Sequence, residues 1–431
     1  MNQPDPTLTA AIHDAVQRRR DDIVALLLDL VAASSITGDE REVQRRVRAA
    51  YETSGLAVDQ WEATPEEIAP YLVHVGEQPR YTGRPNLVAT RAGAGDGRSV
   101  MLQGHVDTVD PGDPALWTRN PAGEATADRV YGRGAADMKG GIVTNIAALD
   151  VFADLGVTLN GDVMLAASVG EEDGGLGALS TILRGHRADA VVITEPTELN
   201  VVIAQGGSLV FRITITGRSA HGASRNEGVS AVEKFIPIFQ DLLAWEAERN
   251  ATLSHPLYDH LENKFPISVG LVRAGTWAST VPELLVAEGR LGFLPGESIG
   301  DMMRQAEDRI RTVADKDPWL REHPPVVEWF GGQFASAEVS PDEPIAVAVG
   351  DAHAAATGER ATIAGVPYGA DMRLFTEIGR MPAIMYGAGS AKNVHCPDEF
   401  IEIDELLTAV ETIAHTLVRW CGASPQEIPA P

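Results

Sequence analysis

Five short segments of this 431-residue chain combine histidines or carboxylates with turn-forming residues. At least four of them follow stretches that we expect to be strands, and open α/β sheets place their active sites at the carboxyl ends of strands. We therefore expect the five segments to meet in one site. In chain order they are 104–110, 131–141, 168–175, 193–197 and 387–399.

The side chains in these segments suit a divalent metal ion. His105 is followed two residues later by Asp107, so that one ring nitrogen can bind a metal while the carboxylate or nearby groups orient the ring. Glu171 and Glu172 are adjacent, and buried carboxylates this close repel each other unless a cation compensates. With His395, the segments offer two imidazoles and several carboxylates, which favours zinc over magnesium or calcium. Taken singly, each segment also fits a structural role, such as a solvated acidic turn.

The composition narrows the possible functions. The chain has 61 acidic residues against 35 Lys and Arg, a formal net charge of −26, which argues against nucleic acid and anionic membranes as partners. Two cysteines, Cys396 and Cys421, are too few for a disulfide framework. The N-terminal sequence lacks the apolar core of a secretory signal, and the apolar stretch 24–33 is short and interrupted by Asp29. We expect a cytoplasmic protein.

Hydrophobic periodicity indicates the elements that position these segments. Apolar runs at 86–90, 98–104, 162–169 and 188–194 predict strands, and residues 142–152 have helical spacing. This alternation predicts a largely parallel sheet with helices on both faces. Other expectations are helical spacing at 8–33, an irregular stretch at 60–84 and a frayed tail at 422–431.

The pattern changes near residue 206. A β-α-β-β-α order between residues 208 and 314 predicts a small α+β domain inserted into a larger α/β domain. Alternating strands and helices return after Pro325. We therefore expect one domain made from residues 1–206 and 326–431, and an inserted domain of residues 207–325.

The combined motifs resemble those of one enzyme family. The chain is similar to acetylornithine deacetylase, succinyl-diaminopimelate desuccinylase, aminoacylase-1 and carboxypeptidase G2, which are co-catalytic zinc aminoacylases and peptidases. The matching strings are His105-Val-Asp107, Gly-Arg-Gly-Ala-Ala-Asp137-Met-Lys-Gly-Gly, Gly-Glu171-Glu172, Glu195-Pro and the late His395. The resemblance implies a zinc-peptidase-like three-layer α/β/α catalytic domain with an inserted, ferredoxin-like α+β domain that serves as lid and dimerisation domain.

The resemblance also implies a metal centre. Asp137 would bridge two Zn²⁺ ions per subunit, with Co²⁺ or Mn²⁺ as possible substitutes. His105 and Glu195 would complete one metal site, and Glu172 and His395 would complete the other. In the same way, Asp107 would orient His105, and Glu171 would be the general base, because a carboxylate that is not a ligand is free to move a proton.

Further residues are implied to handle the substrate. His221, in Gly-Arg-Ser-Ala-His-Gly, would reach the partner subunit's site and bind the developing oxyanion. Arg290 and Arg373 match positions that bind a substrate carboxylate, a task that suits a guanidinium. Ser279 stands where several relatives carry Asn, which puts the usual amide contact in doubt, and Gly389 is counted with the substrate-binding residues.

The resulting prediction is a homodimeric zinc amidohydrolase that cleaves the amide of an N-acylated amino acid or related small N-acyl compound, as a deacetylase or desuccinylase does. A dipeptidase or exopeptidase with the same zinc chemistry is the alternative, and a non-catalytic binding protein with the same fold is a third reading. The acyl group, the amine and the native metal are not identified by the sequence.

Overall fold

The computed structural model describes residues 6–78 and 80–424. A large mixed sheet of nine strands forms the centre of the molecule. Eight of its strands lie in the order β1-β2-β7-β3-β8-β16-β9-β14, and β15 pairs with β9 beside this path. The strands are β1 (Ala57–Glu62), β2 (Pro85–Arg91), β3 (Val100–His105), β7 (Val163–Ser168), β8 (Ala190–Ile193), β9 (Val201–Gln205), β14 (Ala337–Glu338), β15 (Ile363–Val366) and β16 (Ala383–Met385).

The sheet is parallel at its centre, and toward its edges it is antiparallel except where β15 pairs with β9 in parallel. The neighbours β7, β3, β8 and β16 run parallel. By contrast, β1 pairs with β2, β2 with β7, and β9 with β16 and β14 in antiparallel fashion. The expectation of a largely parallel sheet is therefore correct only for the middle, since antiparallel strands have been added at both ends of the sheet.

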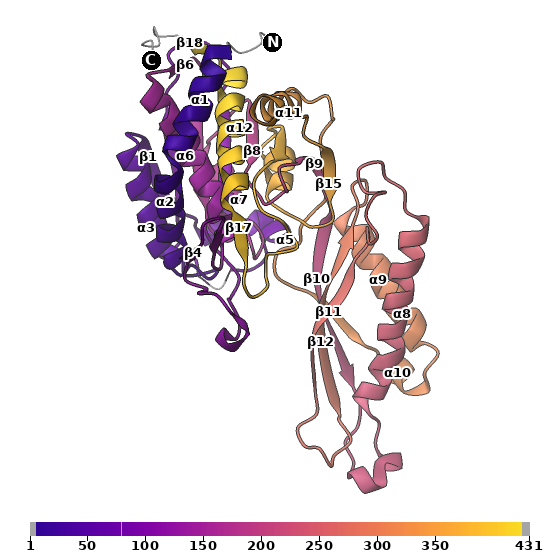
Figure 1. Cartoon of the computed structure of the whole chain (residues 1–431). Coiled ribbons are helices and arrows are strands. Elements are labelled where there is room, and N and C mark those ends of the chain that lie inside the picture. Colours follow the sequence, from indigo (N-terminus) through magenta and orange to yellow (C-terminus); the bar gives the residue numbers. More distant parts are fainter. Residues whose placement is uncertain (1–5, 79, 425–431) are drawn as a thin grey trace.

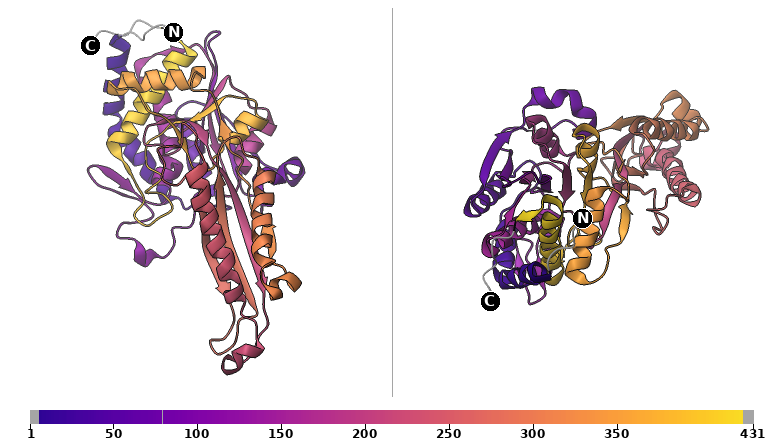
Figure 2. Two further views of the ribbon diagram at one scale, coloured as in Figure 1. Left: turned by 90° about the vertical axis from the view of Figure 1, so that its right-hand side faces the viewer. Right: turned by 90° about the horizontal axis from the view of Figure 1, so that it is seen from above.

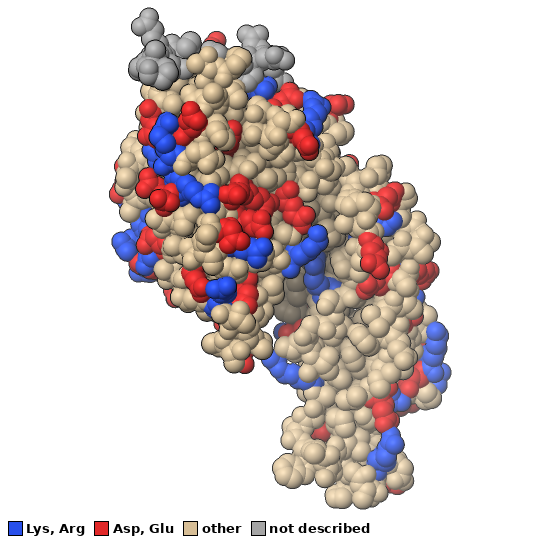
Figure 3. Space-filling view, viewed as in Figure 1, with Lys and Arg blue, Asp and Glu red and all other residues tan. Residues whose placement is uncertain are grey.

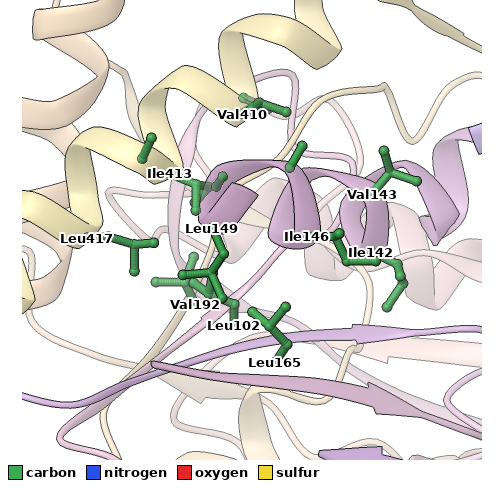
Figure 4. Packing of buried hydrophobic residues seen from close by; sticks show 14 of the residues in the cluster. Leu102, Ile142, Val143, Ile146, Leu149, Leu165, Val192, Val410, Ile413 and Leu417 are labelled. Atoms are coloured by element: carbon green, nitrogen blue, oxygen red, sulfur yellow. The ribbon is translucent and has the colours of Figure 1, made fainter. Parts of the chain in front are cut away.

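Helices cover both faces of this sheet, which gives the expected three-layer α/β/α arrangement. One face packs against α1, α2, α6, α11 and α12, and the other packs against α7. Alternate residues of β3 enter the two cores: Val100 and Leu102 face α6 and α12, whereas Met101 faces the opposite side. Figure 4 shows side chains of α6 lying between the strands and α12. These helices are α1 (Pro6–Arg18), α2 (Arg20–Ala32), α6 (Gly140–Leu155), α7 (Leu176–Arg184), α11 (Pro344–Thr357) and α12 (Ile403–Cys421).

Two local expectations are refined by the structure. The helical stretch 8–33 is divided into α1 and α2 at Arg19, whose guanidinium pairs with Asp150 and Asp154 on α6. The stretch 60–84 is not irregular throughout, because it holds the end of β1 and the short helices α4 (Pro65–Ile68), η1 (Ala69–Tyr71) and α5 (Leu72–Val75). At the C-terminus, Ala423–Ser424 form β18, which pairs with β6 (Thr158–Leu159); the rest of the tail that we expected to fray, residues 425–431, lies outside the described residues.

A second sheet projects from the large one as a separate unit (Figures 1 and 2). Its strand order is β11-β12-β10-β13, every neighbouring pair is antiparallel, and α8 and α9 pack against it. The order β-α-β-β-α-β with this pairing is ferredoxin-like. Its elements are β10 (Gly207–Thr216), α8 (Ala231–Thr252), β11 (Ile267–Ala274), β12 (Leu284–Phe293), α9 (Ile299–Ala314) and β13 (Val326–Trp329). We call residues 207–329 the small unit; β13 begins just beyond the boundary expected at 325.

The charged surface is mixed rather than uniformly acidic. On the face drawn in Figure 3, Asp and Glu alternate with Lys and Arg over the large unit, and the surface is hollowed between the two units. Among the described residues, no helix has the length and apolar character needed to cross a membrane. Both cysteines, Cys396 and Cys421, are free thiols.

Candidate active site

His105 is the last residue of β3, and it is almost fully buried. Its Nδ1 donates to the backbone carbonyl of Asp107 at 3.0 Å, which fixes the ring and leaves Nε2 to face the Asp137 carboxylate, also at 3.0 Å. An imidazole held by one nitrogen in this way presents the other nitrogen to a metal. The ring of His105 is thus oriented by the backbone of Asp107.

The Asp107 carboxylate has a different set of partners. Its two oxygens accept the backbone N–H groups of Glu171 and Glu172 at 3.1 and 3.2 Å, and Thr37 Oγ1 donates to it at 3.0 Å. Its Oδ1 also lies 3.6 Å from Nδ1 of His105, so the carboxylate is close both to the histidine ring and to the turn that carries Glu171 and Glu172. Asp107 therefore fixes the relative positions of these two segments.

Asp137 lies between the two histidines. Its Oδ1 is 3.0 Å from Nε2 of His105, and its Oδ2 is 3.3 Å from Nε2 of His395. It precedes α6, whose Gly141 permits a close approach to the strand end that carries Glu195, because a Cβ there would lie 2.2 Å from the carbonyl oxygen of Thr194. The two histidines hold the pKa of Asp137 below its usual value, although burial acts in the opposite direction.

Two groups of potential metal ligands share Asp137. One joins it to His105 and Glu195, the other to Glu172 and His395, and the ligand atoms in each group lie within 4.8 Å of one another. Nitrogen and oxygen donors gathered in this way fit a pair of zinc-type cations with one bridging carboxylate. All five residues predicted as metal ligands are therefore brought together.

Burial opposes ionisation of several carboxylates in this site. Desolvation, with the neighbouring acidic groups, raises the pKa of Glu171, Glu172 and Glu195 above the usual range. Hydrogen bonds to Asp137 and Glu172 raise the pKa of His395 to about 10. A site so rich in buried carboxylates is one that divalent cations would stabilise.

Glu171 lies on the wall of this site but outside both ligand groups. A cavity of about 290 Å³ is lined by four of the acidic side chains, namely Asp137, Glu171, Glu172 and Glu195, together with His395 and Arg290. Glu171 therefore faces the same space as the ligands without being one of them.

Glu399 is a buried carboxylate to which the sequence analysis gave no role. Its Oε1 accepts three backbone N–H groups, from Gly134, Ala136 and Asp137, at 3.0, 3.1 and 3.2 Å. Its Oε2 accepts from Arg133. Glu399 follows His395 by four residues, so these hydrogen bonds connect the loop that carries His395 to the segment that carries Asp137. Its place in the last of the five segments was the available signal.

Tyr368 was also missed. It lines the cavity, and its hydroxyl oxygen is buried without a hydrogen-bond partner in the described part of the chain. Burial, with Glu195 and Asp137 nearby, raises the pKa of Tyr368, so its hydroxyl is a donor at neutral pH. No motif marked it, since a single tyrosine in a loop carries no spacing signal.

The two arginines predicted to bind substrate differ in position. Arg290, on β12, lines the cavity, and among the described residues its side chain makes one hydrogen bond, from Nε to Ser208 Oγ at 3.2 Å. Burial lowers the pKa of Arg290. Arg373 is fully buried. Its Nη2 donates to the carbonyls of Gly174 at 2.9 Å and His74 at 3.3 Å, while Nε and Nη1 have no hydrogen-bond partner in the described part of the chain.

The remaining predicted residues separate into two places. Gly389 is at the site, where a Cβ would lie 3.1 Å from the side chains of Ala136 and Pro196. His221 and Ser279 are exposed, and backbone contacts join the loops that carry them. These loops follow β10 and β11, at the end of the small unit that points away from the large sheet (Figure 1). Within one chain, the structure does not bring them to the cavity.

The sequence matches the family described as Peptidase family M20/M25/M40 over residues 101–419, so the chain belongs to this family. It is a metallohydrolase whose relatives include enzymes named for cleavage of amide bonds.

Two relatives illustrate the range of the family. The N-formyl-4-amino-5-aminomethyl-2-methylpyrimidine deformylase of Halalkalibacterium halodurans is 26% identical, covering 94% of this chain and 96% of its own. The acetylornithine deacetylase of Edwardsiella ictaluri is 28% identical over 80% of this chain and 85% of its own.

Among solved structures, human carnosine dipeptidase 1 has a TM-score of 0.78 at 15% identity, covering 97% of this chain and all 100% of that one. A dinuclear metal-binding M20 peptidase of Bacillus subtilis has a TM-score of 0.61 at 15% identity, covering 93% and 98%. These similarities confirm the α/β fold class.

Proposed function

We propose that this protein is a zinc-dependent amidohydrolase that cleaves the amide bond of an N-acylated amino acid or a related small N-acyl compound. One observation carries the proposal: Asp137 lies between His105 and His395 and belongs to both ligand groups, while Glu171 lines the same cavity and belongs to neither. That is the arrangement needed for two cations and a separate general base.

The five ligands would hold two Zn²⁺ ions, with Co²⁺ or Mn²⁺ as substitutes: His105, Asp137, Glu172, Glu195 and His395. When bound, the ions supply Lewis acidity that activates water and polarises the acyl carbonyl. Glu171 accepts the proton of the attacking water and delivers it to the leaving nitrogen, which needs no further acid. The Asp107 carboxylate accepts a hydrogen bond from the backbone N–H of Glu171 and so holds this residue in place.

Substrate recognition is assigned to residues around the cavity. Among the residues that the structure describes, no carboxylate pairs with Arg290, so it is available for a substrate carboxylate, and a bidentate contact suits its guanidinium. The unpartnered hydroxyl of Tyr368 donates a hydrogen bond to the substrate. Arg373 and Gly389 support the substrate-binding wall of the cavity. Arg373 does so by donating a hydrogen bond to the carbonyl of Gly174, which follows the turn that carries Glu171 and Glu172.

We also propose a homodimer formed through the small unit, which acts as lid and dimerisation domain. One face of α8 exposes an apolar stripe with helical spacing: Val232, Ile236, Phe239 and Leu243. The neighbouring β11 is an edge strand of its sheet. Because His221 and Ser279 are exposed and distant from the cavity of their own chain, pairing through the small unit gives them a site in the partner. A cytoplasmic location fits this proposal.

A dipeptidase is the alternative within the family, and the similarity to human carnosine dipeptidase 1 motivates it. A panel of N-formyl, N-acetyl and N-succinyl amino acids, N-formyl aminomethyl heterocycles and dipeptides distinguishes the two readings. We expect turnover of N-acyl compounds by the zinc-loaded enzyme. Turnover of dipeptides alone would reject the deacylase assignment.

A further inference from the structure

A second cavity adjoins the catalytic one and shares part of its wall. The second cavity has a volume of about 700 Å³, and the residues common to both cavities are Pro196, Arg290, Tyr368 and Ala391. The catalytic cavity alone, at about 290 Å³, is at the small end of ligand pockets, which range over about 300–1,000 Å³. A substrate bound at the shared wall therefore has space to extend in one further direction.

The wall of the second cavity beyond Arg290 is largely apolar. The connection between α8 and β11 contributes Pro256, Leu257 and Leu261, with the polar His260 and Asn263 among them, and β15 with the residue after it contributes Val366 and Pro367. These two sides are tied together by a backbone hydrogen bond from Gly365 to Leu257.

The charges around this apolar wall are unequally matched. Glu198 and Lys392 pair with each other at 3.3 Å, and Ser390 also donates to Glu198, so both charged groups have a partner. Among the described residues, the Arg290 side chain has only Ser208 as a hydrogen-bond partner, and burial lowers the pKa of Arg290. One unpaired cation therefore stands between a polar catalytic cavity and an apolar second cavity.

We propose that the second cavity receives a large apolar side chain of an N-acylated amino acid whose carboxylate is held by Arg290. This inference rests on the proposed function and narrows its substrate class to N-acyl derivatives of bulky aliphatic or aromatic amino acids. The scissile amide lies in the catalytic cavity, the carboxylate lies at the shared wall, and the side chain extends toward Leu261. Burial of such a side chain in place of water gives the discrimination.

The test compares kcat/KM for N-acetylglycine, N-acetylleucine and N-acetylphenylalanine. The wild-type enzyme should prefer the two larger substrates at least tenfold, since burial of apolar groups gives factors of about 10–200 per group. In Leu261→Trp, which fills the cavity, this preference, measured as the ratio of kcat/KM for N-acetylleucine or N-acetylphenylalanine to that for N-acetylglycine, should fall about tenfold or more. Val326→Trp, at an exposed position of the small unit, is the matched control and should behave as wild type.

The possible results separate the inference from the function on which it rests. Equal kcat/KM values across the series in the wild type, or an equal loss for every substrate in Leu261→Trp, would overturn the inference while leaving deacylation intact. Turnover of no N-acetyl amino acid by zinc-loaded enzyme would overturn both. Leu261→Ala enlarges the cavity and gives an independent check: its preference should move toward N-acetyltryptophan, and an unchanged order among the substrates would contradict the assignment.

Discussion

Nε2 of His395 lies 3.1 Å from Oε1 of Glu172, although 223 residues separate them in the sequence. Glu172 follows the end of β7, and His395 lies in the loop after β16, so the two meet only because both strands belong to the central sheet. Both also surround Asp137. The site is thus built by the fold as a whole, and its buried carboxylates need a compensating charge.

Removal of the metal should therefore cost both stability and activity. We expect a chelator to abolish turnover and to lower the melting temperature, because Glu172 and Glu195 remain buried beside Asp137 without cations. Added Zn²⁺ at about 100 times its Kd should restore about 2.7 kcal/mol for each site. Calorimetry and metal analysis measure these changes; undiminished turnover by metal-free protein would reject the zinc assignment.

Replacement of Glu171 by Gln should separate metal binding from proton transfer. Glu171 is not a member of either ligand group, so Glu171→Gln should bind metal like the wild type. Its kcat should fall about 100- to 10,000-fold, the usual contribution of a general base. Metal content and steady-state kinetics are measured on the same preparation. A variant with wild-type kcat would show that another group moves the proton.

Glu399 should act on the metal through the backbone that it holds. In Glu399→Gln, the three N–H groups around Asp137 lose their charged acceptor, so metal affinity should weaken about 10- to 100-fold, as for other outer partners of ligands. Titration of the metal-free protein with Zn²⁺ measures this directly. The control is Glu402→Gln, whose carboxylate is half-exposed and pairs with Arg129. Equal affinities in the two variants would contradict the role of Glu399.

The hydroxyl of Tyr368 should contribute to binding of the reacting substrate. Tyr368→Phe keeps the ring and removes the donor. A hydrogen bond to a charged group contributes about 1.5–3 kcal/mol, so its loss should lower kcat/KM roughly 10- to 150-fold. Tyr258→Phe is a close control, because its hydroxyl is also buried and unpartnered among the described residues but does not line either cavity. Equivalent kinetics for both variants would remove Tyr368 from the site.

The role of His221 can be tested by mixing two inactive proteins. His221→Ala and Glu171→Gln subunits should each be nearly inactive alone. If His221 serves the partner's cavity, a mixed dimer contains one complete site, and random pairing of equal amounts restores about a quarter of wild-type activity. No recovery after confirmed subunit exchange would place His221 outside the catalytic site.

Sequence reasoning found the five candidate metal ligands because they stand in recognisable strings that resemble those of one enzyme family, and most of them lie at a strand end or a helix start. His105 and Asp137 are examples, since glycines and apolar runs mark their surroundings. Tyr368 could not be found in this way, because its importance comes from a neighbouring cavity formed by distant segments. The antiparallel edges of the sheet were also missed, since periodicity identifies a strand but not its partner.

The division of the first helix at Arg19 has a similar cause. Spacing of apolar residues continues through the break, so the sequence suggests continuity. At the break, the Arg19 guanidinium pairs with Asp150 and Asp154 on α6, more than 130 positions away. The local pattern therefore predicted that this region is helical, but it carries no signal of such long-range contacts and did not locate the break.

The chain enters and leaves the small unit at adjacent points. Ser208 and Phe334 exchange backbone hydrogen bonds, each of 2.8 Å, so the entrance and exit are as close as two neighbouring strands. An insertion joined in this way is structurally independent of the rest of the chain. A different small unit whose two ends are also about 4.8 Å apart can replace it without any change in the large sheet. Such an exchange would leave the side chains around Asp137 in place, because they are carried by the large unit.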